Sequence, residues 1–303
     1  MAITAQDVKA LREMTGVGMM DCKKALAASD GDMDKAVEWL REKGLAASAK
    51  KAGRIAAEGM AYACVIDGVG VVVEVNAETD FVGKNEKFVD FVKGVASTVA
   101  AYAPADLDAL MECKYSGTDL TVTQQQQEMV LVIGENIKVR RFARFADGTS
   151  VPYIHAGGKI GVLVNLEVTG GIDATEVGKD MAMQIAALNP RFLDKSQVTQ
   201  DVLDEEKKIL LAQMDNDPKM ASKPAQVKEK IVEGKLNKFY AENCLLQQTF
   251  VKDNDVTVEQ YMNAAAKKLG GAITLKDAVR FEKGEGIEKK QENFAEEIAK
   301  LAQ

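Results

Sequence analysis

The 303-residue sequence has few of the side chains that most often support catalysis or metal binding. Its single histidine, His155, excludes metal sites built from several histidines and leaves one imidazole as a candidate general base. The four cysteines, Cys22, Cys64, Cys113 and Cys244, are widely scattered and match neither a CxxC metal motif nor a disulfide framework. We interpret them as small core hydrophobes and expect a reducing, cytoplasmic environment.

The sequence also lacks long hydrophobic runs and an excess of positive charge. No stretch approaches the ~18 apolar residues of a membrane-spanning helix, and the opening MAITAQDVKALREM does not have the pattern of a signal peptide. The formal net charge is -7, whereas general nucleic-acid binding demands a basic face. We therefore expect a protein partner, with one local basic patch around Lys50, Lys51 and Arg54.

Nucleotide-binding motifs are missing as well. The sequence has no GxxxxGK[ST] loop, and the GVG at 68–70 and the GEG at 284–286 lack the other glycines of a dinucleotide fingerprint. We expect no direct nucleotide binding, no cofactor and no metal. The proportions of hydrophobic residues, 47%, and charged residues, 28%, are those of an ordinary globular protein, and the length favours two domains or one domain with small modules.

Helical periodicity dominates the first 54 residues. Thr4 is a candidate N-cap for a helix that carries Val8, Leu11 and Met14 on one face. A second helix is expected over 19–28, and Asp32 is a candidate cap for a third. The Ala-rich, basic residues 46–58 then read as a connector, whether helical or not.

From Met60 onward, strand-like apolar runs at 60–66 and 69–76 flank a DG turn at 67–68 and predict a β-hairpin, followed by a helix from about Lys84 to Ala101. The arrangement returns 91 residues later, where Tyr153 matches Tyr62 and GVLV at 161–164 matches GVVV at 70–73. The chain therefore contains an internal duplication, and the two copies can cover each other's open sheet faces.

A charged helical hairpin interrupts the second copy. Helices are expected over 200–213 and 225–239, although their apolar positions sustain too few heptads for an independent coiled coil. The tail predicts a strand at AVRFE and a last helix from about Lys289 to Leu301. The expected α+β organisation is a three-helix docking module with its connector (1–54), a first core subdomain (55–148), a second core subdomain (149–198 and 240–280), an inserted coiled-coil hairpin (199–239) and a C-terminal module (281–303).

The loop AETDFVGK at 77–84 is the main candidate for a functional site. Its pattern is also typical of a helix start in which Asp80 is the N-cap and Phe81 packs back as a hydrophobic staple. The second copy has Gly171 and Ile172 at these two positions, so the scaffold does not require the Asp-Phe pair. We therefore hypothesise that Phe81 contacts a partner.

The adjacent Met19 and Met20 form a second candidate contact. Neighbouring helical residues cannot both face one core stripe, so one of them is expected to point outward, where methionine suits an adaptable protein interface. The alternative is that both side chains fill the small module.

Four long motifs carry a resemblance to a known family: LREMTGVGMMDCKKAL, EVNAETDFVGKNEKF, IGENIKVRR and RFEKGEGIEKK. With these motifs the chain resembles the elongation factor Ts family over essentially its whole length. The resemblance implies a ubiquitin-associated-like N-terminal module, two core subdomains, a coiled-coil hairpin and a C-terminal helix. It also implies a non-enzymatic role in translation, in which the protein binds the GTPase elongation factor Tu and promotes GDP release.

The resemblance assigns roles to particular residues. The loop that enters the GTPase domain and dislocates Mg²⁺ corresponds to Thr79, Asp80, Phe81 and Val82. The other partner contacts it implies are Met19, Met20, Lys23, Ile133, Gly134 and His155. His155 is thus a contact residue and not a catalyst, although residues 156–158 depart from the family pattern. No role is assigned to residues 104–130.

Two other functions fit parts of the sequence. An RNA- or ribosome-associated protein would use the basic residues from Lys50 to Arg54, and a small cytosolic enzyme would use His155. Neither accounts for the difference between the two copies at Asp80 and Phe81. The sequence leaves open whether the protein is a monomer or a dimer, because the helical hairpin can pair with a second copy or project alone.

Overall fold

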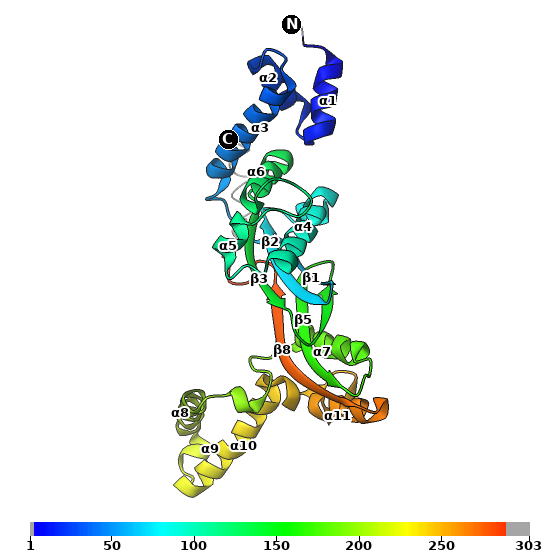
Figure 1. Ribbon diagram of the computed structural model, residues 1–303. Coiled ribbons are helices and arrows are strands. Elements are labelled where there is room, and N and C mark those ends of the chain that lie inside the picture. Colours follow the sequence, from blue (N-terminus) through cyan, green and yellow to red (C-terminus); the bar gives the residue numbers. More distant parts are fainter. Residues whose placement is uncertain (1–2, 289–303) are drawn as a thin grey trace.

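The computed structural model describes residues 3–288, so the predicted C-terminal helix from about Lys289 lies outside the described residues. The fold is α+β, as expected (Figure 1). A helical module and a long helical hairpin lie at opposite ends of the molecule, with two β-sheets between them (Figure 1). No helix within residues 3–288 is long and apolar enough to cross a membrane.

The N-terminal module consists of three helices: α1 (Ala5–Thr15), α2 (Met19–Ala28) and α3 (Met33–Lys51). Thr4 and Asp7 form a capping box at the start of α1, and Asp32 caps α3, as the sequence predicts. The fully buried Leu11 and Leu26 lie at the centre of the module. Helix α3 continues to Lys51 and so includes the first part of the expected connector, residues 46–51, because alanine-rich sequence favours helix.

Two antiparallel three-stranded sheets form the core, with strand orders β1-β2-β3 and β4-β5-β8. Their strands are β1 (Glu58–Ile66), β2 (Val69–Ala77), β3 (Lys138–Phe145), β4 (Thr149–His155), β5 (Ile160–Thr169) and β8 (Ala272–Glu282). Tyr62 pairs with Val73 in the first sheet, and Tyr153 pairs with Val162 in the second. Each copy therefore contains an antiparallel hairpin at the repeated positions, but the register differs by two residues, because a strict 91-residue repeat would pair Tyr153 with Val164.

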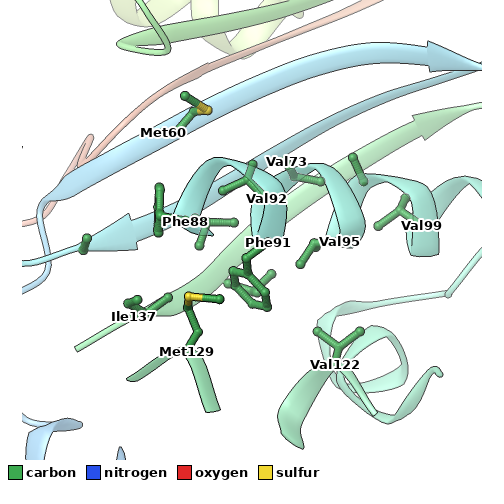
Figure 2. Close-up of a cluster of buried hydrophobic side chains, with 14 of the residues drawn as sticks. Met60, Val73, Phe88, Phe91, Val92, Val95, Val99, Val122, Met129 and Ile137 are labelled. Carbon is green, nitrogen blue, oxygen red and sulfur yellow. The ribbon is translucent and has the colours of Figure 1, made fainter. Parts of the chain in front are cut away.

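Helices cover the outer face of each sheet. The first sheet is covered by α4 (Glu86–Tyr102), α5 (Leu107–Glu112) and α6 (Val122–Ile133), and the second by α7 (Thr175–Leu188) and α11 (Val258–Leu269). Figure 2 shows how Phe88 and Phe91 of α4 reach between the strands and Met129 of α6. Residues 104–130, which the sequence left without a role, thus supply α5 and most of α6 to this core.

The inner faces of the two sheets pack against each other, as the duplication predicted. The buried contact is made by Ala61, Ala63, Val72, Leu163 and Phe281. The repeated glycines, Gly70 and Gly161, lie on this face. A Cβ on Gly70 would collide with Ser150, and one on Gly161 would crowd the backbone of Ala61, so the close approach of the sheets explains why glycine recurs at this position.

The duplication extends further than the sequence repeat suggested. Helices α6 and α11 both begin with a Thr/Gln capping box and end at a left-handed glycine, Gly134 or Gly270, before the last strand of their sheet. Each copy is therefore a hairpin, a helix, a second helix and a strand. Because the inserted hairpin lengthens the second copy, the second helix and the last strand do not recur at the 91-residue spacing, and a comparison at that spacing misses them.

Glu74 is a buried charge between the two sheets. Its Oε1 accepts hydrogen bonds from Asn76 Nδ2 (3.0 Å), Arg140 Nη1 (2.9 Å) and the Gly284 N–H (2.8 Å), and its Oε2 accepts one from Arg141 Nε (2.5 Å). Burial alone raises the pKa of the Glu74 carboxyl, but these hydrogen bonds outweigh it and hold the pKa below its ordinary value. The carboxylate ties the chain after β8 to the first sheet.

The insertion is a helical hairpin made of α8 (Gln200–Asn216), the short α9 (Pro218–Ala221) and α10 (Ala225–Asn243). Both long helices extend a few residues beyond their predicted ends. Leu210, Met214 and Val232 form its buried seam. The short elements around its base are η2 (Lys195–Gln197), η3 (Leu245–Gln247), β6 (Thr249–Phe250) and β7 (Asp253–Thr257).

Candidate partner-binding site

The loop between β2 and α4 presents one large apolar side chain to solvent. Phe81 is 80% exposed, whereas the next residue, Val82, is only 7% exposed and packs into the core of the first subdomain. Thr79 and Asp80 are also exposed. The loop therefore separates an anchored residue, Val82, from three residues that are accessible to a partner.

The interpretation of this loop as a simple helix start is wrong. Helix α4 begins at Glu86, and its N-cap is Asn85, whose Oδ1 accepts a hydrogen bond from Lys87 N at 3.0 Å. Asp80 is thus too far upstream to cap the helix. Phe81 does not pack back as a staple, because most of its surface is in solvent.

Glycines hold the underside of the loop. Gly83, in the short 3-10 helix η1 (Val82–Lys84), lies against the carbonyl of Gly59 at the start of β1. Gly59 has a φ of +113°, and a Cβ there would collide with β2. Only glycine allows this approach. The loop therefore packs directly against the backbone of β1, which limits its movement toward the core.

A carboxylate fixes the other side of the loop. Glu135, which follows the glycine that ends α6, accepts hydrogen bonds from Glu78 N (3.0 Å), Thr79 N (3.0 Å) and Thr79 Oγ1 (2.7 Å). In return, the Glu78 carboxylate accepts one from Asn136 N at 2.6 Å. We call this reciprocal arrangement of Glu78, Thr79, Glu135 and Asn136 the clasp.

Arg54 contacts two residues of the clasp. Its guanidinium lies 3.4 Å from Glu78 Oε1, and its carbonyl accepts a hydrogen bond from Asn136 Nδ2 at 2.8 Å. One member of the basic patch expected around Lys50, Lys51 and Arg54 is therefore paired with a carboxylate, although the Arg54 side chain stays about half exposed.

The structure brings two of the sequence motifs together. Phe81 and Ile133 line one shallow hollow with Val82, Lys87 and neighbouring residues. Gly134 follows directly as the left-handed end of α6, with a φ of +88°. Residues 79–82 and 133–134, which are more than 50 positions apart in the sequence, thus form a single surface.

The N-terminal module reaches this surface from the other side. Lys87 Nζ donates a hydrogen bond to the Gly16 carbonyl at 3.1 Å, and Leu131 and Val132 of α6 pack against the module's core. Met19 and Met20 are 53% and 65% exposed. The alternative that both methionines fill the module is therefore wrong, and both are accessible instead of the one expected.

Lys23, one turn further along α2, is exposed as well. The start of α2 therefore presents two methionines and a lysine to solvent. The N-terminal module to which α2 belongs is in contact with α4 and α6. This is the side of the module on which the resemblance places partner contacts.

His155 ends β4 with an exposed side chain. Its Nδ1 lies within hydrogen-bonding distance, 3.1 Å, of Tyr153 Oη. The turn after it is joined to β1, where the Ala61 N–H donates a hydrogen bond to the Gly158 carbonyl at 2.8 Å. Because β1 also supports Gly83, His155 is connected to the loop through one strand.

The prediction that the cysteines are core residues is confirmed for Cys22 and Cys244, which are buried, whereas Cys64 and Cys113 are partly exposed. Burial raises the pKa of the Cys64 and Cys244 thiols to about 11, which keeps them protonated and poorly nucleophilic at neutral pH. Within residues 3–288, no group of three or more His, Cys, Asp or Glu side chains is placed to hold a metal ion.

Sequence reasoning missed the residues that support the loop. Glu78, Glu135 and Asn136 are ordinary polar residues in sequence, and nothing in their spacing joins them. Gly134 carries the useful signal, because a glycine at the end of a periodic helix predicts a left-handed cap and places the next residues back against the core.

Comparisons with known proteins agree with the resemblance. The family model described as Elongation factor TS matches residues 78–285. Elongation factor Ts of Trichlorobacter lovleyi is 50% identical over 312 residues, covering 100% of this chain and 99% of that protein. The proteins of the same name from Magnetococcus marinus, 46% identical with 100% of both chains covered, and Clostridium perfringens, 50% identical with 99% of both covered, are similarly close.

Proposed function

The chain belongs to the elongation factor Ts family of translation elongation factors, and we propose that it is the guanine nucleotide exchange factor of elongation factor Tu. In this proposal it binds the GDP-bound GTPase, displaces Mg²⁺ and the elements that hold the phosphates, and leaves a nucleotide-free complex that GTP can reload. The factor breaks no covalent bond.

The exposed Phe81 on a supported loop is the observation that carries this proposal. Leaving a phenylalanine in water forgoes about 1.5–3 kcal/mol of burial free energy, and the folded chain does not require it there. Glycine contacts below the loop and Glu135 beside it limit how far it can yield. A wedge that displaces part of another protein needs both an apolar tip and a stiff base.

Burial of Phe81 alone supplies too little free energy to account for fast GDP release. Accelerating GDP release by ~10⁴ means lowering a barrier by roughly 5.5 kcal/mol, whereas burying one phenylalanine supplies about 1.5–3 kcal/mol. Further docking contacts must provide the remainder. We assign them to the exposed Met19, Met20 and Lys23, to Ile133 and Gly134 beside Phe81, and to His155.

The mechanism is negative coupling. The factor and Mg²⁺-GDP each weaken the other's hold on the GTPase, by the same free energy in both directions. Mg²⁺ is a natural point of attack because it demands near-ideal octahedral geometry and is held by few protein ligands together with the phosphates. A small displacement of those ligands by Asp80 and Phe81 is enough to release it.

The direct test is the release of fluorescent GDP from purified elongation factor Tu, followed by stopped flow with and without this protein. We expect a saturable acceleration of several orders of magnitude. A release rate that stays at its unstimulated value up to micromolar factor would overturn the proposal.

A further inference from the structure

The two copies of the duplicated unit differ at the clasp, and the second copy serves as an internal comparison. Gly134 and Gly270 end the equivalent helices α6 and α11, so Glu135 corresponds to Gly271. The 91-residue repeat pairs Glu78 with Thr169. Equivalent positions therefore meet in both copies, but the residues that meet are different.

In the second copy the two segments touch through backbone and the apolar side chain of Ile172, which lies against Gly271. A Cβ on Gly271 would collide with the Thr169 carbonyl, and one on Gly170 would lie 2.8 Å from the Gly271 Cα. This contact closes the loop without any charged side chain. The scaffold can thus complete the connection between the middle strand and the helix end with glycine.

In the first copy a carboxylate occupies the same place. Glu135 accepts three hydrogen bonds from Glu78 and Thr79, the two residues directly before Asp80 and Phe81. Charge-assisted hydrogen bonds are roughly twice as strong as neutral ones. The two backbone N–H groups held by one oxygen fix the direction in which the chain leaves β2, and hence the direction in which it presents Phe81.

We propose that Glu135 is the positioning residue of the Phe81 loop, and that the clasp sets the orientation in which Phe81 meets its partner. Glu135 contacts neither nucleotide nor metal in this account and acts through Glu78 and Thr79. The proposal rests on the proposed exchange function for its kinetic consequence, but its structural consequence for the loop holds in the free protein.

The kinetic test compares Glu135→Ala with the near-isosteric Glu135→Gln in the full chain. Glutamine can turn its oxygen to the two backbone N–H groups and its amide to Thr79 Oγ1, so it preserves the geometry. We expect Glu135→Ala to lower the maximal rate of GDP release about tenfold, with a smaller change in the half-saturating concentration. Glu135→Gln should stay within about threefold of the unmodified protein.

The control is Glu176→Gln, which removes an exposed carboxylate at the start of α7 in the second copy, where it pairs with Lys179. It should leave the maximal rate unchanged. Rates are expressed per folded molecule, from circular dichroism on the same preparations. If Glu135→Ala stimulated GDP release at the normal rate per folded molecule and differed only in its unfolded fraction, the positioning role would be overturned.

A second measurement requires no GTPase. Phe81→Trp in a Trp39→Phe background places the sole tryptophan at the loop tip, and its fluorescence anisotropy reports local motion. Adding Glu135→Ala should lower this anisotropy, and Glu135→Gln should restore it. Unchanged anisotropy with Glu135→Ala would overturn the clasp, whereas a protein that passes this test and fails to stimulate GDP release would refute only the proposed function.

Discussion

At the scale of single residues, the first copy carries side chains that the second copy lacks. Phe81 is exposed where the second copy has Ile172, and Glu135 replaces Gly271. Glu74 is fully buried, whereas its counterpart 91 residues later is the neutral Asn165. Phe81 and Glu135 call for an explanation from partner contact and loop positioning, whereas Glu74 has a structural role, because it pairs with Arg140 and Arg141.

Phe81→Ala should slow factor-stimulated GDP release by about tenfold to a hundredfold, because roughly 1.5–3 kcal/mol of apolar contact is lost. Its Tm should barely change, since an exposed loop residue adds little to the core of the free factor. Stopped-flow release and calorimetry on one preparation measure both quantities. A destabilised variant with normal exchange per folded molecule would contradict the wedge.

Glu74→Gln should lower the free energy of unfolding at neutral pH by about 2–4 kcal/mol, since it leaves Arg140 and Arg141 without their buried partner. The folded pKa of Glu74 is lowered, so the carboxylate stabilises the fold fully above its unfolded pKa of ~4.3. That stabilisation is lost as pH falls through the folded pKa.

Calorimetry of both proteins from pH 7 to pH 3 tests this linkage. The difference in Tm should be full at pH 6–7 and should shrink below about pH 4. A difference that stays constant over this range would show that packing, and not the charge, accounts for the effect of the substitution.

At the scale of elements, local signals in the sequence were sufficient where capping and periodicity agree. Thr4, Asp32 and the DG turn at 67–68 each predicted a boundary that the structure confirms. Strand β3 was not predicted, because its sequence KVRRFARF places Arg141 where an inward-facing apolar residue is expected. That arginine faces inward to meet Glu74, a partner 67 positions away that no local pattern reveals.

The candidate site was predictable only in part, because some of its residues come together through long-range packing that no local pattern reveals. Phe81 stood out through the comparison of the two copies, but Glu135 and Asn136 are recognisable only once α6 is placed against β2. Helices α5 and α6 were missed, because the first is short and the second begins with VTQQQQ, which has little apolar periodicity.

The helical hairpin should be dispensable for basic exchange. Glu206 and Lys235 line the same hollow above the cluster of Val198, Phe239 and Cys244 at the base of the hairpin. Replacing residues 207–234 with a short Gly/Ser linker therefore keeps that base intact. The variant should retain native circular dichroism, adjusted for the helix removed, and GDP release within about threefold. A folded variant without exchange activity would show that the hairpin contributes directly.

At the scale of the whole molecule, two sheets packed back to back join the proposed contact residues into one body. The first sheet supports the Phe81 loop, α6 holds the N-terminal module against it, and the second sheet brings His155 to β1. Contacts that are far apart in sequence can therefore act on a partner together. Such an arrangement suits a factor whose effect must exceed what any one side chain supplies.

The proposed function requires that this body couple negatively to GDP on elongation factor Tu. Isothermal titration of the factor into the nucleotide-free GTPase and into the Mg²⁺-GDP form measures that coupling directly. Linkage requires the two dissociation constants of the factor to differ by the same ratio as the GDP dissociation constants measured without and with saturating factor. We predict a ratio of at least a hundredfold in both experiments. Equal affinity of the factor for the two forms of the GTPase would contradict the account.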